Sequence, residues 1–372
     1  MRIEIDATPL LLRSAGIKNY FYYWIRHLRR IAGEDSISAF PFLGEFGGLN
    51  HEASVLNPWA TWPRLGLLYF INYAPAVPVM DWIASRADVI HLSNQVRHPP
   101  RRTPLTATIH DMTCWRMPQF HTGANVKADK TFAERVFQKA AGLIAVSENT
   151  KKDAVEILDL DPDKVEVIYS GIAGTYFNTH ASGVQRAAAR YGLDKPYILF
   201  VGTIEPRKNI DTLLDAYEAL PESVRTEVDL VVAGPAGWRS EATRRRLESQ
   251  ERGVRYLRYV PEDDLPSLMA GATVFAYLSW YEGFGFPVAQ AMACGAPVLV
   301  SNVSSLPEVA GGAGLTVDPN SVSEAASALD RLLTTPSLRD ELSARGKARA
   351  QRYRWEECAR QSLEFFRRAA NR

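Results

Sequence analysis

Cysteine and net charge are both scarce in this chain of 372 residues. Its three cysteines, Cys114, Cys294 and Cys358, lie far apart and form no Cys-x-x-Cys pair. This argues against a zinc site or a disulfide framework and favours a reducing compartment. The formal net charge is +1, so the chain as a whole exerts no pull on nucleic acid, and no nucleic-acid partner is expected.

The chain also lacks a long apolar run and a leader-like N-terminus. The best candidate for a membrane span, residues 65–83, is interrupted by Asn72, Pro75, Pro78 and Asp81. It therefore falls short of the roughly 20 apolar residues that a spanning helix needs. The first residues resemble a buried strand more than a signal peptide, because they lack an apolar core segment and a small-residue cleavage site. We predict a cytoplasmic protein and leave open a peripheral contact with the inner face of the cytoplasmic membrane.

A further absence concerns the Gly-x-Gly-x-x-Gly pattern that follows the first strand of many dinucleotide-binding domains. The corresponding loop contains Gly16 before a predicted amphipathic helix at residues 20–30, but no such glycine series. A nicotinamide- or flavin-dependent dehydrogenase is therefore disfavoured. Gly16 by itself allows a backbone amide to approach a phosphate group.

What the chain does contain is a regular alternation of β-rich apolar runs and helical patterns. Predicted strands of the first half are residues 3–6, 88–92, 105–109, 143–146 and 165–168. Predicted strands of the second half are residues 197–201, 228–233, 254–259, 273–278, 298–300 and 315–317. Continuous apolar runs of this kind indicate parallel strands that are buried on both faces. The predicted fold class is therefore α/β, with two doubly wound domains built from βαβ units.

The domain boundary is placed where the alternation pauses. A single core seldom grows beyond roughly 300 residues, so length alone favours two domains. We predict an N-terminal domain of residues 1–178 and a C-terminal domain of residues 179–350. A long helix is predicted for residues 338–372, and its last part, 351–372, is expected to pack back on the first domain. Ligands of open parallel sheets bind beyond the carboxyl ends of the strands, which predicts a cleft between two such domains.

Two segments of the second half point to a ligand. Arg207 and Lys208 follow a predicted strand and the residues Gly202 and Thr203, and they precede a predicted helix. Adjacent cations beside the free amides of a helix N-terminus suit a diphosphate ligand. In the second segment, residues 282–285 (Glu-Gly-Phe-Gly) form a turn before a short helix that Pro287 opens. A carboxylate beside the bare amides of a helix N-terminus can bind a polyhydroxylated or phosphorylated ligand.

Other segments carry weaker signals, each with a structural alternative. His110 and Asp111 end a strand; the imidazole can bond a sugar hydroxyl, and Asp111 can orient it or cap the next turn. Ser305 and Glu308 have the spacing of a capping box, and Ser147 is predicted as an N-cap. Residues 59–82 hold six large aromatic side chains, interpreted mainly as core, and residues 97–102 form a basic loop, interpreted as solvated. Together they leave a lipid-headgroup or sugar contact open.

These segments resemble the retaining glycosyltransferases of family 4, over nearly the whole chain. The resemblance is most specific in residues 200–209, 282–287 and 291–298, and the mannosyltransferase-like group 1 branch is closest. It implies the GT-B fold, in which two Rossmann-like domains face each other, and a GDP- or UDP-linked sugar as donor. No metal and no further cofactor are implied.

The resemblance also implies roles for individual residues. Arg207 and Lys208 would hold the donor diphosphate and neutralise the leaving group. Glu282 would contact hydroxyl groups of the donor sugar, and His110 would contact the same sugar from the first domain. The remaining donor-binding positions implied by the resemblance are Gly16, Gly202, Thr203, Gly283, Phe284, Gly285 and Gln290.

Two departures from the family pattern bear on activity. Gln290 stands where the family usually has a second Glu that binds the nucleotide ribose, and glutamine bonds a hydroxyl without charge assistance. Thr203 stands where some members have Arg, so phosphate binding depends more on Arg207 and Lys208.

The function predicted from the sequence is retaining transfer of a hexose, with mannose as one candidate, to a hydroxyl of a glycan or a lipid-linked glycan. Two alternatives remain. One is a catalytically weak or inactive nucleotide-sugar-binding protein, motivated by Gln290. The other is a different two-domain enzyme, such as an epimerase or a phosphorylase, which fits the turns at 205–208 and 282–285 less well.

Overall fold

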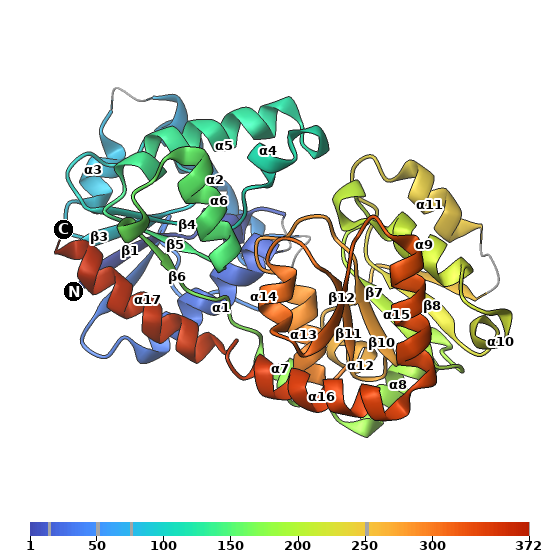
Figure 1. Cartoon of the computed structure of the whole chain (residues 1–372). Helices are drawn as coiled ribbons and strands as arrows, with labels where there is room; N and C mark the ends of the chain where they lie inside the picture. Colours follow the sequence, from blue (N-terminus) through green and yellow to red (C-terminus); the bar gives the residue numbers. More distant parts are fainter. Residues whose placement is uncertain (14–15, 50–52, 75–76, 250–252, 372) are drawn as a thin grey trace. The chain divides into compact units, whose positions relative to one another are not determined.

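The computed structural model describes residues 1–13, 16–49, 53–74, 77–249 and 253–371. The chain forms two compact units: residues 1–171 with 355–372, and residues 172–354. Each unit contains one six-stranded parallel sheet flanked by helices (Figure 1).

The sheet of the first unit has the strand order β2-β1-β3-β4-β5-β6. Its strands are β1 (Arg2–Asp6), β2 (Ser36–Phe40), β3 (Val89–Leu92), β4 (Leu105–Ile109), β5 (Gly142–Ala145) and β6 (Val165–Val167). Its helices are α1 (Gly16–Ile31), α2 (Pro58–Tyr73), α3 (Val79–Ala84), α4 (Thr113–Arg116), α5 (Gly123–Arg135), α6 (Glu148–Leu158) and α17 (Trp355–Ala370), with short 3₁₀ turns η1 (Thr8–Leu11), η2 (Pro118–Phe120), η3 (Phe137–Lys139) and η4 (Pro162–Lys164). The edge strand β2 was not predicted.

The sheet of the second unit has the order β12-β11-β10-β7-β8-β9. Its strands are β7 (Tyr197–Val201), β8 (Asp229–Ala233), β9 (Val254–Arg258), β10 (Val274–Tyr277), β11 (Val298–Ser301) and β12 (Gly314–Val317). Its helices are α7 (Gly174–Phe177), α8 (Ala181–Tyr191), α9 (Ile210–Glu218), α10 (Glu222–Arg225), α11 (Glu241–Glu248), α12 (Leu265–Ala270), α13 (Phe286–Cys294), α14 (Leu306–Ala310), α15 (Val322–Thr334) and α16 (Pro336–Ala350), with η5 (Pro206–Lys208). Strands β7, β8, β10 and β11 are almost entirely buried, as continuous apolar runs predict.

The order of the second sheet reverses between β7 and β10. Chain segments that follow these two neighbouring strands therefore emerge side by side at the carboxyl edge. Helices α9 and α15 pack together as one group, and α12 packs with α8 and α13 as another. This arrangement brings the segments at 202–209 and 279–285 together, although they are far apart in sequence.

The predicted single helix over residues 338–372 is wrong, because the chain forms α16 and α17 with a break at residues 351–354. Tyr353 is buried in the second unit, where its hydroxyl donates to the Val309 carbonyl at 2.9 Å. Trp355 then begins α17 in the first unit. A Cβ atom on Gly171 would lie 2.4 Å from the Trp355 ring, so only glycine fits beside it.

Helix α17 packs along α1 within the first unit. Its aromatic side chains Phe365 and Phe366 are buried, and Trp24 of α1 donates from its indole nitrogen to Ser362 Oγ at 2.9 Å. Full burial of one large apolar side chain contributes roughly 2 kcal/mol, so these contacts attach the tail firmly.

Candidate functional site

The site in the second unit begins at the carboxyl end of β7. The Gly202 amide donates to the Ala233 carbonyl at 2.9 Å, and the Ile204 amide donates to the Pro235 carbonyl at 2.9 Å. These two bonds fix the segment after β7 to the segment after β8. Gly234 is essential to this contact, since a Cβ there would lie 1.9 Å from the Gly202 carbonyl oxygen. Gly202 was predicted from the sequence as a ligand-binding position, and Gly234 was not.

Arg207 and Lys208 lie on the short turn η5. The next residue, Asn209, has a left-handed backbone (φ 54°) and is buried. Its side-chain amide donates to the carbonyls of Leu278 at 3.0 Å and Pro319 at 2.7 Å, which tie the turn to the segments after β10 and β12. The two cations are thus held on a rigid turn.

Glu282 lies between the two cations and forms the centre of an ionic cluster. Lys208 Nζ is 2.6 Å from Glu282 Oε1, and Arg207 Nη1 is 3.1 Å from Glu282 Oε2. Arg207 also pairs with Glu205 at 2.6 Å, and Lys208 Nζ donates to the Tyr277 hydroxyl at 2.8 Å. The predicted cations and the predicted carboxylate therefore contact one another directly, an arrangement that was not predicted from the sequence.

Burial and charge act in opposite directions on the ionisation of this cluster. Burial raises the pKa of Glu282, but Arg207 and Lys208 outweigh it and bring that pKa down to about 2. For Lys208, burial and the neighbouring Arg207 lower the pKa, while Glu282 and Glu205 raise it. Glu282 is thus a carboxylate at neutral pH, able to accept hydrogen bonds from hydroxyl groups but unable to donate a proton.

The turn that carries Glu282 is held by two serines that precede α14. Ser304 Oγ accepts the Glu282 amide at 3.0 Å, and the Ser305 hydroxyl donates to the Glu282 carbonyl at 2.9 Å. The predicted capping box of Ser305 with Glu308 is wrong, because Ser305 directs its hydroxyl to Glu282 and makes no side-chain cap bond. These serines fix the position of the carboxylate.

The glycine turn leads into α13. Gly285 has a left-handed backbone (φ 91°), and a Cβ there would lie 2.6 Å from Leu306 Cδ2. Phe284 is buried, with ring centroids 5.2 Å from Phe286 and 5.3 Å from Tyr353. The ring of Phe284 therefore packs in the core, and only the backbone of this residue can contact a ligand.

Gln290 lies on α13 and is buried. Within the part of the chain that the structure describes, no hydrogen bond to its side-chain amide is found. The side chain keeps some exposure (8%) and is not among the buried polar groups that lack a partner, so its amide stays accessible to a ligand. This observation is compatible with the predicted contact to a ribose hydroxyl.

His110 and Asp111 line a small cavity of about 90 Å³ in the first unit. His110 follows β4, and the ring of Tyr20 meets it edge-on with centroids 4.9 Å apart. Burial lowers the pKa of His110 to about 4, although Asp111 acts in the opposite direction. His110 is therefore neutral at physiological pH and can donate or accept one hydrogen bond through each ring nitrogen.

Three other predictions in the first unit have clear outcomes. Asp111 caps the following turn, accepting from the Thr113 amide at 2.9 Å. Ser147 is confirmed as an N-cap, since its Oγ accepts from the Thr150 amide at 3.0 Å. Gly16 is the first residue of α1, and a Cβ there would meet nothing within 4 Å; the two residues before it lie outside the described part.

The structure thus brings Arg207, Lys208 and Glu282 together and leaves His110 and Gly16 in the other unit. The cluster also includes partners that were not predicted from the sequence, namely Glu205, Tyr277 and Ser304, and Ser305 was predicted only as a helix cap. Only Glu205 carried a usable signal, because it precedes the two cations in the same short motif.

Comparison with known proteins identifies the family. The model of glycosyl transferases group 1 matches residues 184–349, and that of glycosyltransferase family 4 matches residues 15–173. O-antigen chain mannosyltransferase B of Escherichia coli is 34% identical over 72% of this chain and 71% of its own length. The chain belongs to the group 1, family 4 glycosyltransferases.

Two further similarities support the glycosyltransferase assignment and its fold. The serotype-specific mannosyltransferase WbdA of Escherichia coli is 30% identical over 62% of this chain, which spans only 29% of the length of WbdA. The crystal structure of HepE (Alr3699) of Anabaena in complex with UDP has a TM-score of 0.73, with 19% identity and 98% of each chain covered. The predicted two-domain α/β GT-B fold is confirmed.

Among the described residues, no group of three or more His, Cys, Asp or Glu side chains is arranged to hold a metal ion. No helix within those residues has the length and apolarity needed to span a bilayer.

Proposed function

We propose that this glycosyltransferase transfers a hexose, with mannose as the first candidate, from a GDP- or UDP-linked donor to a hydroxyl group of a glycan or lipid-linked glycan. The observation that carries the proposal is the buried pairing of Arg207 and Lys208 with Glu282 where the sheet order reverses. The names of the Escherichia coli relatives support mannose and a polysaccharide acceptor, and the UDP bound to HepE supports a nucleotide donor.

The cluster is suited to a leaving diphosphate. Arg207 and Lys208 balance the charges of Glu205 and Glu282, so the cluster by itself is neutral. Lys208 has three N–H donors, of which the described contacts use two, for Glu282 and Tyr277. We propose that its third donor binds a phosphate oxygen and that the guanidinium of Arg207 adds positive charge beside it. Negative charge grows there as the bond from C1 of the sugar to phosphate breaks, and one such donor is worth roughly 3 kcal/mol.

Glu282 and His110 then act on the sugar. Glu282, ionised and fixed by Ser304 and Ser305, accepts hydrogen bonds from sugar hydroxyls. The family resemblance assigns His110, neutral at physiological pH, a hydrogen bond to a hydroxyl of the donor sugar. Both groups orient the donor, and neither of them transfers a proton in this mechanism.

We propose that transfer retains the anomeric configuration. The oxygens of Glu282 are bonded by Lys208 and Arg207, which makes this carboxylate a poor nucleophile. The acceptor oxygen therefore attacks C1 on the face that the phosphate leaves, and its proton passes to the departing phosphate oxygen. The positive groups supply the charge stabilisation, so we expect chelation of metal ions to leave the rate unchanged.

We further propose a growing glycan as the acceptor, which the name of the O-antigen chain relative supports. A lipid-linked glycan as acceptor and a location at the inner face of the cytoplasmic membrane are part of the same proposal.

The proposal is tested by a thermal-shift panel of GDP, UDP, ADP and dTDP on the wild type and on Lys208→Ala. A ligand at a hundred times its dissociation constant stabilises a protein by about 2.7 kcal/mol. We expect one nucleotide to shift the wild type strongly and the variant weakly. No shift with any nucleotide would contradict the proposed donor site.

Gln290 favours a second candidate, a protein of the same fold that binds the nucleotide sugar and transfers it slowly or not at all. It predicts the same thermal shift without product formation. The two candidates are separated by measuring release of nucleoside diphosphate from the donor in the presence of acceptor.

A further inference from the structure

Helix α2 exposes a row of aromatic side chains to solvent. Trp59, Trp62, Tyr69 and Tyr73 recur at intervals of three, seven and four residues, which places them along one side of the helix, and Phe70 is adjacent to Tyr69. Trp59 is 92% exposed and Trp62 is 71% exposed. We call this set, with Trp82 of α3 (74% exposed), the aromatic stripe. The interpretation of these aromatics as core was wrong.

The core contact of α2 is made by a different side of the helix. Thr61, Leu68 and Ile71 are its buried residues. The helix is therefore apolar on two sides, and only one side is covered by the protein. Helices that are apolar all round are normally buried, and large exposed apolar patches mark sites of association.

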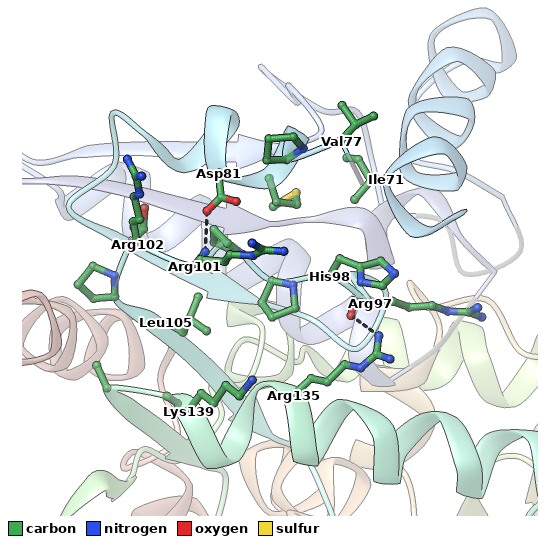
Figure 2. Close-up of a pocket in the computed structure, with 18 of the residues that line it drawn as sticks. Ile71, Val77, Asp81, Arg97, His98, Arg101, Arg102, Leu105, Arg135 and Lys139 are labelled. Carbon is green, nitrogen blue, oxygen red and sulfur yellow. Dashed lines mark hydrogen bonds between the residues drawn. The ribbon is translucent and has the colours of Figure 1, made fainter. Parts of the chain in front are cut away.

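A basic pocket lies at the C-terminal end of the stripe. It is a cavity of about 920 Å³ that Ile71 of α2 and Met80 of α3 line on one side. Its cations are Arg97, Arg101, Arg102, Arg135, Lys139 and Lys164. Figure 2 shows Arg135 and Lys139 reaching from the segment at α5 and η3 toward the loop that carries Arg97, with Ile71 and Val77 at the upper end of the cavity.

The charge of this pocket is not compensated by the residues that the structure describes. Six cations face one carboxylate, that of Asp81, which accepts the backbone amide of Arg101 at 2.6 Å and not a cationic side chain. No ion pair joins any of the six to a described carboxylate. Arg135 donates to the Arg97 carbonyl at 3.0 Å (Figure 2), and the Arg97 guanidinium lies 5.5 Å from the Tyr73 ring centroid.

We propose that the stripe and the pocket together form a docking surface for a lipid bilayer with anionic headgroups. Trp and Tyr side chains favour the membrane–water interface, where an apolar body and a polar tip are both satisfied. The pocket binds headgroup phosphates, and Arg97 stacked on Tyr73 joins the two parts. A bilayer offers apolar chains and a layer of phosphate side by side, which matches this juxtaposition better than a protein surface does.

The surface lies entirely within the first unit and does not require the donor site. A variant can therefore lose vesicle binding and keep nucleotide binding, or lose nucleotide binding and keep vesicle binding. The two proposals are tested separately on the same preparations of the full chain.

The experiment is co-sedimentation with vesicles of phosphatidylcholine alone and of phosphatidylcholine with about one third phosphatidylglycerol. The test variants are Arg101→Gln/Arg102→Gln and Trp59→Ala/Trp62→Ala. Matched controls are Arg244→Gln/Arg245→Gln on α11, which remove the same charge elsewhere, and Tyr259→Ala, which removes an exposed aromatic of the second unit. The nucleotide thermal shift confirms that each variant is folded.

We expect the wild type to prefer anionic vesicles. Removal of each cation should weaken that binding about fivefold, hence about 25-fold for the arginine pair. The tryptophan pair should weaken binding to both vesicle types, and neither control should change it. Equal binding of wild type and test variants, or an equal loss in the Arg244/Arg245 control, would overturn the proposal. It would also fall if the tryptophan variant only converted a dimer to a monomer in light scattering, because the stripe would then contact a second copy of the chain.

Discussion

Replacing Glu282 by Gln removes the negative charge at the centre of the cluster and leaves its shape nearly unchanged. In the folded protein the pKa of Glu282 lies at about 2, compared with 4.5 ordinarily. Because one pKa unit corresponds to about 1.4 kcal/mol, the ionised carboxylate contributes on the order of 3 kcal/mol at neutral pH. Glu282 is buried, so solvent does not screen this interaction strongly.

The pH dependence of this loss follows from the direction of the pKa change. A carboxyl group with a lowered folded-state pKa stabilises the protein above its unfolded pKa, and this contribution is lost as pH falls from about 5 toward 2. The difference in unfolding free energy between wild type and Glu282→Gln should therefore be about 3 kcal/mol at pH 7 and shrink steadily below pH 5.

The assay is urea unfolding at a series of pH values, with Glu341→Gln as the control. Glu341 pairs with Arg345 at 3.1 Å on the exposed side of α16, where such a pair is worth less than about 1 kcal/mol. A pH-independent difference for Glu282→Gln, or a difference no larger than that of the control, would refute the electrostatic account of the cluster.

The remaining predictions concern single positions. The imidazole of His110 should stay neutral down to about pH 5 in an NMR titration, because burial lowers its pKa to about 4; titration near pH 6.5 would contradict this. Gly285→Ala should destabilise the fold by roughly 1–3 kcal/mol, because Gly285 has a left-handed backbone and an added Cβ would collide with Leu306. Gly16→Ala should leave the melting temperature unchanged and lower the rate of sugar transfer from the donor. Gln290→Glu should tighten nucleoside diphosphate binding about tenfold in calorimetry, since a charged acceptor strengthens a hydrogen bond to ribose; unchanged binding would show that Gln290 does not face the ribose.

Much of the fold could be predicted from the sequence because parallel strands are continuous apolar runs. The unpredicted strand β2 is short and alternates polar with apolar residues, as Ser36 and Ser38 show, and it pairs only with β1 at the sheet edge. The break before α17 was also missed, since Tyr353 and Trp355 fit a helical sequence locally. Only the burial of these two rings in different units explains the break.

The site was predicted in its parts and not in its arrangement. Arg207, Lys208 and Glu282 could be found from local motifs. Their mutual contact depends on β7 and β10 being neighbours in the sheet, and the order of strands cannot be inferred from local sequence patterns. For α2 the difficulty was of another kind. Its apolar residues form two stripes, and the sequence does not say that the stripe of Leu68 and Ile71 faces the core.

The most direct test of the proposed transferase is donor turnover by the wild type and Lys208→Met. Each enzyme is incubated with GDP-mannose, UDP-glucose and related donors and a mannose-containing acceptor, and the product is examined by NMR at the anomeric proton. We predict that the wild type uses one of these donors and gives a product with the same anomeric configuration as that donor. The rate of Lys208→Met should be at least about 100-fold lower, which is equivalent to roughly 3 kcal/mol of transition-state stabilisation. Inverted product, or near-normal turnover by the variant, would contradict the mechanism assigned to this cluster.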